Sequence, residues 1–212
     1  QKNIFCFFKS FDTFYNSAII QFVKTNQSDL IIQSQIYMIY ERRVIMDKNL
    51  FAVNPPMGWN SWDCYGASVT EEDLIRNADY MAEHLKPYGW EYVVCDIQWS
   101  EPTADSTAYH AFAELCMDEY GRLMPSPNRF PSAADGKGFK PIADYIHSKG
   151  LKFGIHIMRG IPRQAVAKNV PIKGTDVHAR DIAHTASICA WNSDMYGLNP
   201  VAVGAQAYYD SL

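Results

Sequence analysis

Three side chains with distinct chemical abilities fall at or near the ends of short apolar segments. Trp62 ends the segment 57–62, Asp96 lies near the end of 92–97, and His156 lies near the end of 151–157. A carboxylate accepts charge-assisted hydrogen bonds from hydroxyl groups, an imidazole can donate one, and an indole offers a flat apolar face. The structural alternatives are an aspartate that caps the next loop, a neutral structural histidine and a core tryptophan.

The apolar segments that carry these residues alternate with helical patterns. Strands are predicted at 57–62, 92–97 and 151–157, where short apolar runs are bounded by turn residues. Apolar residues at helical spacing predict helices from the N-cap Thr70 to Leu85, from 139 to 150, and from 202 onward. Alternating strands and helices indicate an α/β fold with a parallel sheet.

Two long segments without clear periodicity, 100–138 and 158–200, each follow a predicted strand. In a (β/α)8 barrel such segments are the loops of the face that carries the active site. A doubly wound sheet would give the same alternation. No G-x-G-x-x-G motif follows a strand, which argues against the dinucleotide-binding version of that sheet. Trp191 and Asp194, in the second long segment, either reach this face or pack the loop.

Composition excludes several functional classes. The net charge of −4 gives no basic footprint for nucleic acid. The apolar runs near the start are too short for a signal sequence or a membrane span. The five cysteines include no C-x-x-C pair, and His178, Asp181 and His184 lack the spacing of metal ligands. We therefore expect no metal, no cofactor, no membrane or nucleic-acid partner, and a reducing, cytoplasmic location.

The first 45 residues differ from the rest of the chain. They are rich in Phe, Ile, Asn and Gln, contain no Gly or Pro, and show no sustained period. Glu41-Arg42-Arg43 can be encoded by a purine-rich ribosome-binding sequence that lies just before Met46. We hypothesise that 1–45 is a non-native or disordered extension and that 46–212 is the domain. On this hypothesis 1–45 is translated upstream DNA and Met46 is the true start, which CGN codons at Arg42 and Arg43 would contradict. The alternative is a poorly packed amphipathic N-terminal extension.

Four ordered blocks resemble glycoside hydrolase family 27, the α-galactosidases. The first is Asn54-Pro-Pro-Met-Gly-Trp-Asn-Ser-Trp62, and the second is the strand segment 88–99. The third combines Gly121-Arg-Leu with Pro127-x-Arg-Phe-Pro131, and the fourth covers 146–156. The resemblance is good from about Asn54 to Gly160 and looser beyond.

The resemblance implies a (β/α)8 barrel that hydrolyses terminal α-D-galactosyl groups with retention. Retention needs two carboxyl groups about 5–5.5 Å apart, which the family places after strands four and six. By strand count this chain is a partial (β/α)8 TIM barrel with the first three βα units only, truncated before strand 4. We therefore expect no catalytic residue in it and no activity of the fragment alone. A non-catalytic carbohydrate-binding remnant and a gene-prediction fragment are the alternatives.

The resemblance also assigns substrate-binding roles to Trp62, Asp96, Ile97 and His156. Trp62 is expected to stack on the sugar ring and Asp96 to accept hydrogen bonds from its hydroxyls. His156 stands where the family often has Tyr. Ile97 departs from the family, which mostly has a second Asp there, and isoleucine accepts no hydrogen bond. β-L-Arabinopyranose is α-D-galactopyranose without the exocyclic CH2OH, so arabinopyranosides are the rival to galactosides as substrate.

Overall fold

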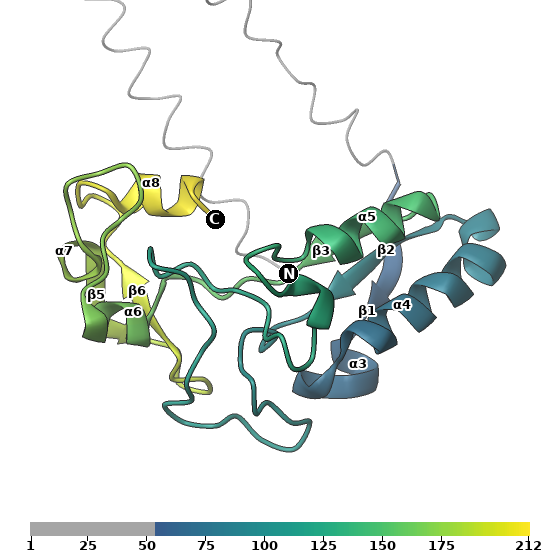
Figure 1. The fold of residues 1–212 in the computed structure, drawn as a ribbon, viewed down its shortest axis with the longest axis horizontal. Helices are drawn as coiled ribbons and strands as arrows, with labels where there is room; N and C mark the ends of the chain where they lie inside the picture. The colour runs from purple at the N-terminus through teal and green to yellow at the C-terminus, as the bar shows by residue number, and fades with distance from the viewer. Residues whose placement is uncertain (1–53) are drawn as a thin grey trace, which may run out of the picture. The chain divides into compact units, whose positions relative to one another are not determined.

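The computed structural model describes residues 54–212, which form one unit. The predicted extension 1–45 and the predicted domain start at Met46 lie outside these residues. The described chain contains a parallel and an antiparallel sheet, each of three strands and each with its own helices (Figure 1). No helix within it combines the length and the apolar character that crossing a membrane requires.

The parallel sheet consists of β1 (Met57–Asn60), β2 (Trp90–Cys95) and β3 (Lys152–Ile155), in that spatial order. Gly58 in β1 lies against the backbone of β2, where a Cβ atom would come within 2.4 Å of the Tyr92 carbonyl oxygen. The predicted parallel arrangement of three strands joined by helices is thus confirmed. The eight-stranded barrel that the resemblance implies stays a prediction, because the parallel sheet has three strands within residues 54–212.

All three strands end two residues earlier than the apolar runs predicted. The last ladder bonds run from the Ser61 N–H to the Val94 carbonyl (3.0 Å) and from the His156 N–H to the Cys95 carbonyl (2.9 Å). Beyond them, Gln98 has a φ of 69°, which turns the chain away from the sheet. Apolar residues such as Ile97 continue past the strand because they are buried, not because they are paired. The predicted site residues therefore follow the strands directly.

Helices cover one face of the parallel sheet. The N-cap Thr70 was predicted correctly: its backbone N–H donates to the Asp73 carboxylate (3.0 Å), and its hydroxyl accepts from the Asp73 N–H (3.3 Å). Leu74, Ile142 and Ile146 pack on the sheet in the first core cluster. The helical and turn elements of this part are α3 (Trp62–Tyr65), η3 (Gly66–Ser68), α4 (Glu71–Tyr80), the π-helical turn η4 (Met81–Leu85), η5 (Lys86–Tyr88), η6 (Pro131–Ala133) and α5 (Lys140–Ser148).

The antiparallel sheet corrects the expectation for 158–200, where no regular structure was predicted. β6 (Met195–Leu198) lies between β4 (Ile161–Pro162) and β5 (Ala183–Ile188). Two of these strands have two and four residues, and the register of the third shifts between His184 and Ile188. Strands this short and irregular leave no periodic signal. The helices of this part are α6 (Arg163–Lys168), α7 (Ala179–Ile182) and α8 (Ala205–Asp210), the last matching the helix predicted from 202.

Arg129 joins the end of β2 to the turn after α3. Its guanidinium donates to the backbone carbonyls of Ala67 and Gln98. The side chain is buried, and this burial lowers the pKa of the guanidinium. Because Gln98 adopts a left-handed conformation, the bond from Arg129 holds the turn that follows Asp96.

Replacing Arg129 by Met should therefore destabilise the chain. The substitution leaves the carbonyls of Ala67 and Gln98 without their donor, which we expect to cost about 2–4 kcal/mol of unfolding free energy. Urea denaturation measures this cost. The control is Arg76→Met, which removes the ion pair between the exposed Arg76 and Asp73 but leaves the bonds from Thr70 to Asp73, and which should cost less than about 1 kcal/mol. Equal losses for the two variants would contradict the role assigned to Arg129.

Candidate functional site

Asp96 is the centre of the site because residues from all three parallel strands meet at its carboxylate. The Asn60 side-chain amide donates to Asp96 Oδ2 (2.7 Å). His156 Nδ1 lies 2.8 Å from Asp96 Oδ1, which also accepts from the Ile97 N–H (2.7 Å). Asn60 ends β1, while Asp96 and His156 directly follow β2 and β3. Parallel strands end at one edge of their sheet, which brings these residues together.

The backbone around Asp96 is held from the other side. The Asp96 N–H donates to the hydroxyl of Ser61 (2.9 Å), and Ser61 is fully buried. The Asn60 side-chain oxygen accepts from the Trp62 N–H (2.8 Å), so the same amide that binds Asp96 also orients the start of α3. Asp96 is therefore fixed by both its main chain and its side chain.

The accessible side of the site belongs to His156 and to part of Asp96. The Asp96 side chain is 13% exposed and that of His156 is 50% exposed. A carboxylate offers about four lone-pair positions, and three donors occupy positions on Asp96. Oδ2 holds only the bond from Asn60, so it can still accept a hydrogen bond from a ligand hydroxyl. The arrangement suits a fixed acceptor rather than a mobile acid.

Three aromatic rings from separate segments form a cluster near Asp96. Trp62 and Tyr109 stack with centroids 5.9 Å apart and an interplanar angle of 16°. Tyr109 also lies 5.2 Å from Trp191, which is 55% exposed. Burial, followed by the nearby Asp96 carboxylate, raises the pKa of the Tyr109 hydroxyl. Both long loops thus contribute a ring to this cluster, Tyr109 from 100–138 and Trp191 from 158–200.

Ile97 is buried, with 4% of its surface exposed. It lines a small cavity together with Gln98, His156 and Asp194. Its backbone N–H donates to the Asp96 carboxylate, and its side chain lines this cavity, which His156 also lines. The expected contact of Ile97 with a sugar stays a prediction, as do the substrate contacts expected of Trp62, Asp96 and His156.

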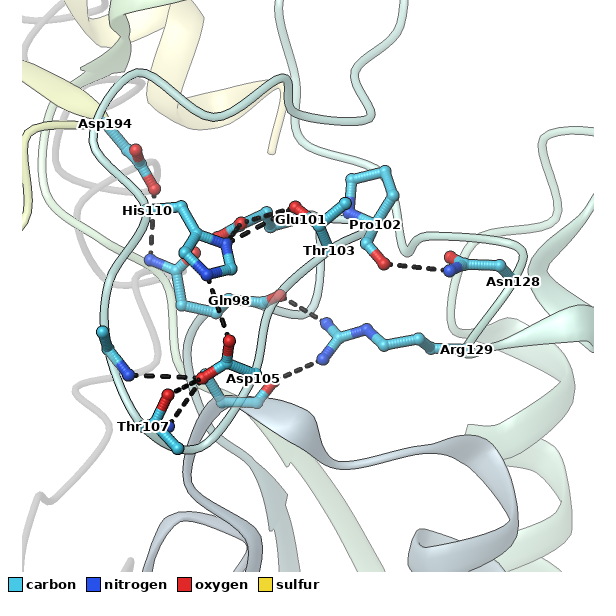
Figure 2. Close-up of polar contacts among 12 residues, drawn as sticks. Gln98, Glu101, Pro102, Thr103, Asp105, Thr107, His110, Asn128, Arg129 and Asp194 are labelled. Carbon is cyan, nitrogen blue, oxygen red and sulfur yellow. Dashed lines mark hydrogen bonds and ion pairs between the residues drawn. The ribbon is translucent and has the colours of Figure 1, made fainter.

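Asp194 reaches the same region from the segment just before β6. Its carboxylate accepts from the Gln98 side-chain amide (3.1 Å), and its N–H donates to the Asn192 side-chain oxygen (3.0 Å). Burial raises the pKa of Asp194. Figure 2 shows Gln98 linked to Asp194 by its side chain and to Arg129 by its carbonyl. The antiparallel part of the chain therefore helps to fix the turn after Asp96.

Asn60 and Tyr109 were not predicted as site residues from the sequence. Asn60 lies inside the predicted strand 57–62, two residues before its predicted end, and the shorter observed β1 ends at it. Tyr109 lies within a 39-residue loop segment, 100–138, that has no periodicity, so no sequence signal placed it. Within residues 54–212, no group of three His, Cys, Asp or Glu side chains is arranged to hold a metal ion.

Comparison with known proteins shows the family to which this chain belongs. Residues 54–199 match the family model described as Alpha galactosidase A. The Cyamopsis tetragonoloba alpha-galactosidase is 33% identical over 73% of this chain, which spans 32% of that relative's length. The chain thus spans about a third of the length of the curated relatives that it matches.

Solved structures give closer similarity. A Geobacillus stearothermophilus β-L-arabinopyranosidase of glycoside hydrolase family 27, crystallised with arabinose, is 69% identical with a TM-score of 0.77. The alignment covers 79% of this chain and 39% of that one. The wild-type form of that enzyme is 70% identical with a TM-score of 0.76, over 77% of this chain and 38% of the enzyme.

Removing the Asn60 side chain tests the centre of the site. Asn60→Ala breaks the bonds to Asp96 and to the Trp62 N–H, and we expect a loss of about 1–3 kcal/mol in unfolding free energy. The matched control is Asn199→Ala, because Asn199 is exposed and its side-chain oxygen accepts from the Val201 N–H (3.3 Å). Urea denaturation should show a clearly larger loss for Asn60→Ala, and a loss no larger than the control's would contradict this account.

Proposed function

The chain belongs to the Alpha galactosidase A family of glycoside hydrolases, and on that premise we propose that it supplies the sugar-recognition part of a β-L-arabinopyranosidase. The observation that carries the proposal is an isoleucine, Ile97, directly after Asp96: its N–H donates to the Asp96 carboxylate, and its buried side chain lines a cavity with His156. The 69% identity to an arabinopyranosidase over most of this chain supports the same choice. The 33% identity to a plant alpha-galactosidase supports the family more than the substrate.

Asp96, Asn60 and His156 suit recognition of the hydroxyl groups common to both sugars. In the proposed complex, Asp96 Oδ2 accepts a hydrogen bond from a ring hydroxyl, because this oxygen holds only the bond from Asn60. His156 is half exposed and can turn its free ring nitrogen toward a second hydroxyl. Trp62 supplies an apolar face for the ring carbons.

Ile97 discriminates between the two sugars at the exocyclic position. α-D-Galactopyranose carries a CH2OH group that β-L-arabinopyranose lacks. A polar group that meets an apolar wall loses its bonds to water and gains none, which disfavours the larger sugar. A site built to bind a hydroxyl can discriminate by orders of magnitude, whereas an apolar wall discriminates more modestly. We therefore expect a preference for arabinopyranosides rather than complete exclusion of galactosides.

The proposed reaction is hydrolysis with retention. One carboxylate attacks the anomeric carbon while a second carboxylic acid protonates the leaving oxygen, and water then releases the sugar from the covalent intermediate. The two groups lie about 5–5.5 Å apart in such enzymes. We place both outside residues 54–212, because the family positions them after strands four and six. Residues 54–212 then bind and orient the sugar.

The second candidate is an α-galactosidase, which the curated relatives favour. The discriminating experiment uses a chimera in which residues 54–212 replace the matching segment of the Geobacillus stearothermophilus enzyme. We expect this chimera to hydrolyse a nitrophenyl β-L-arabinopyranoside with a higher kcat/KM than the α-D-galactopyranoside. A higher kcat/KM for the galactoside would make the second candidate correct. If the chimera folds but neither hydrolyses nor binds either sugar, the segment has no carbohydrate function and both candidates are wrong.

Substituting Ile97 in this chimera tests the specificity argument. Ile97→Asp supplies an acceptor for the exocyclic hydroxyl, so the arabinoside-to-galactoside ratio of kcat/KM should fall by about tenfold or more. The control is Ile188→Asp, because Ile188 is exposed in β5 and should leave the ratio unchanged. If Ile97→Asp also leaves the ratio unchanged, Ile97 does not determine the sugar.

A further inference from the structure

The loop from Glu101 to His110 is closed by a bridging histidine. His110 Nδ1 lies 2.6 Å from the Glu101 carboxylate, and its Nε2 lies 3.1 Å from that of Asp105 (Figure 2). Glu101 is 1% exposed, so one end of the bridge is anchored in the interior. A histidine that contacts two carboxylates through both nitrogens donates from both, which is the bonding pattern of the imidazolium ion.

The outer end of the bridge is also ordered. One Asp105 oxygen accepts from the backbone N–H groups of Thr107 (2.7 Å) and Ala108 (3.3 Å), which is an Asx turn. The other oxygen is the one that faces His110. The Asp105 carboxylate therefore holds the tip of the loop and the histidine at the same time.

Tyr109 precedes His110 in the chain and belongs to the aromatic cluster of the site. Its ring stacks on Trp62 and contacts Trp191, and the Asp96 carboxylate influences its hydroxyl. Nearly all hydrogen bonds of this loop run through Glu101, Asp105 and His110. A loop of small and polar residues has little apolar burial of its own to keep an aromatic side chain in place.

We propose that Tyr109 forms a third wall of the sugar site, and that His110 is the positioning residue that holds this wall against Trp62 by bridging Glu101 and Asp105. The proposal rests on the proposed sugar site and adds to it a loop residue that contacts the ligand. Trp191, which contacts Tyr109, is 55% exposed, so the group attached to the sugar would lie on this side of the cluster.

The charges around the bridge give it a defined pH range. The hydrogen bond to Glu101, followed by its charge, raises the pKa of His110 above the ordinary 6.5. Bonds from Thr107 lower the pKa of Asp105 to about 2. A raised histidine pKa means that the bridge is complete below about 6.5 and is lost as pH rises through the higher folded value. The lowered Asp105 pKa keeps that carboxylate charged throughout this range.

Other charged groups face the bridge from neighbouring segments. Asp194 and Arg129 both interact with the charge of Glu101, and Arg163 interacts with Asp194. The groups that act on His110 itself are Glu101 and Asp105. The direct contacts with Glu101 and Asp105 are the shortest of these interactions that reach His110.

A pH titration of the whole chain followed by NMR tests the proposal without relying on any variant. The ring signals of His110 and the indole N–H signals of Trp62 and Trp191 are followed from about pH 5 to about pH 9, a range that brackets an ordinary histidine. We expect the two indole signals to move with the His110 midpoint, above about 6.5. Indole signals that stay constant while His110 titrates would overturn the proposal.

Two variants and a control sharpen the result. His110→Gln cannot form the cationic bridge, and Asp105→Asn weakens its outer end, so each should abolish or reduce the pH response of Trp62 and Trp191. His84→Gln is the control, because the imidazole of His84 contacts the exposed Glu83 and Tyr80 rather than the bridge. A pH response that survives in both bridge variants would overturn the proposal.

Binding of L-arabinose separates this inference from the proposed function. We expect the Kd at about pH 9 to be about fivefold weaker than at about pH 6, which is the value of one aromatic contact, and the His110→Gln variant to lose this difference. An equal Kd at both pH values, with indole signals that follow His110, would overturn the positioning role. Absence of binding at every pH would overturn the proposed function instead, and the NMR titration would still decide on the bridge.

Discussion

The structure of the site depends on one partly buried carboxylate that stands where three parallel strands end. A charged oxygen withdrawn from water must find donors within the protein, and Asp96 finds them in Asn60, His156 and the Ile97 backbone. Each donor belongs to a different strand end or to the turn after Asp96. The same bonds that stabilise the charge therefore fix the relative positions of the strand ends. One carboxylate oxygen can still accept a hydrogen bond from a ligand hydroxyl.

Much of this arrangement could be predicted from the sequence. Short apolar runs placed Asp96 and His156 at strand ends, and the N-cap Thr70 marked the first long helix, because burial and capping leave local signals. The ends of the strands were predicted two residues too late, since apolar character reports burial and Ile97 is buried without being paired. The antiparallel sheet and the position of Tyr109 depend on contacts between distant segments, which no local period encodes.

Family and substrate rest on different parts of the chain. The blocks that resemble the family form the strands, helices and turns around Asp96. The proposed substrate choice depends on Ile97. Its apolar side chain directly after the acidic centre is the reason why we propose a sugar without an exocyclic CH2OH.

The most direct test of the central role of Asp96 is calorimetric titration of the chain with L-arabinose. The account predicts binding that Asp96→Asn weakens by at least about tenfold, since a hydrogen bond to a charged group contributes about 1.5–3 kcal/mol. Asp63→Asn, at an exposed position in α3, should bind like the unmodified chain. Arabinose binding that Asp96→Asn leaves unchanged would contradict the account.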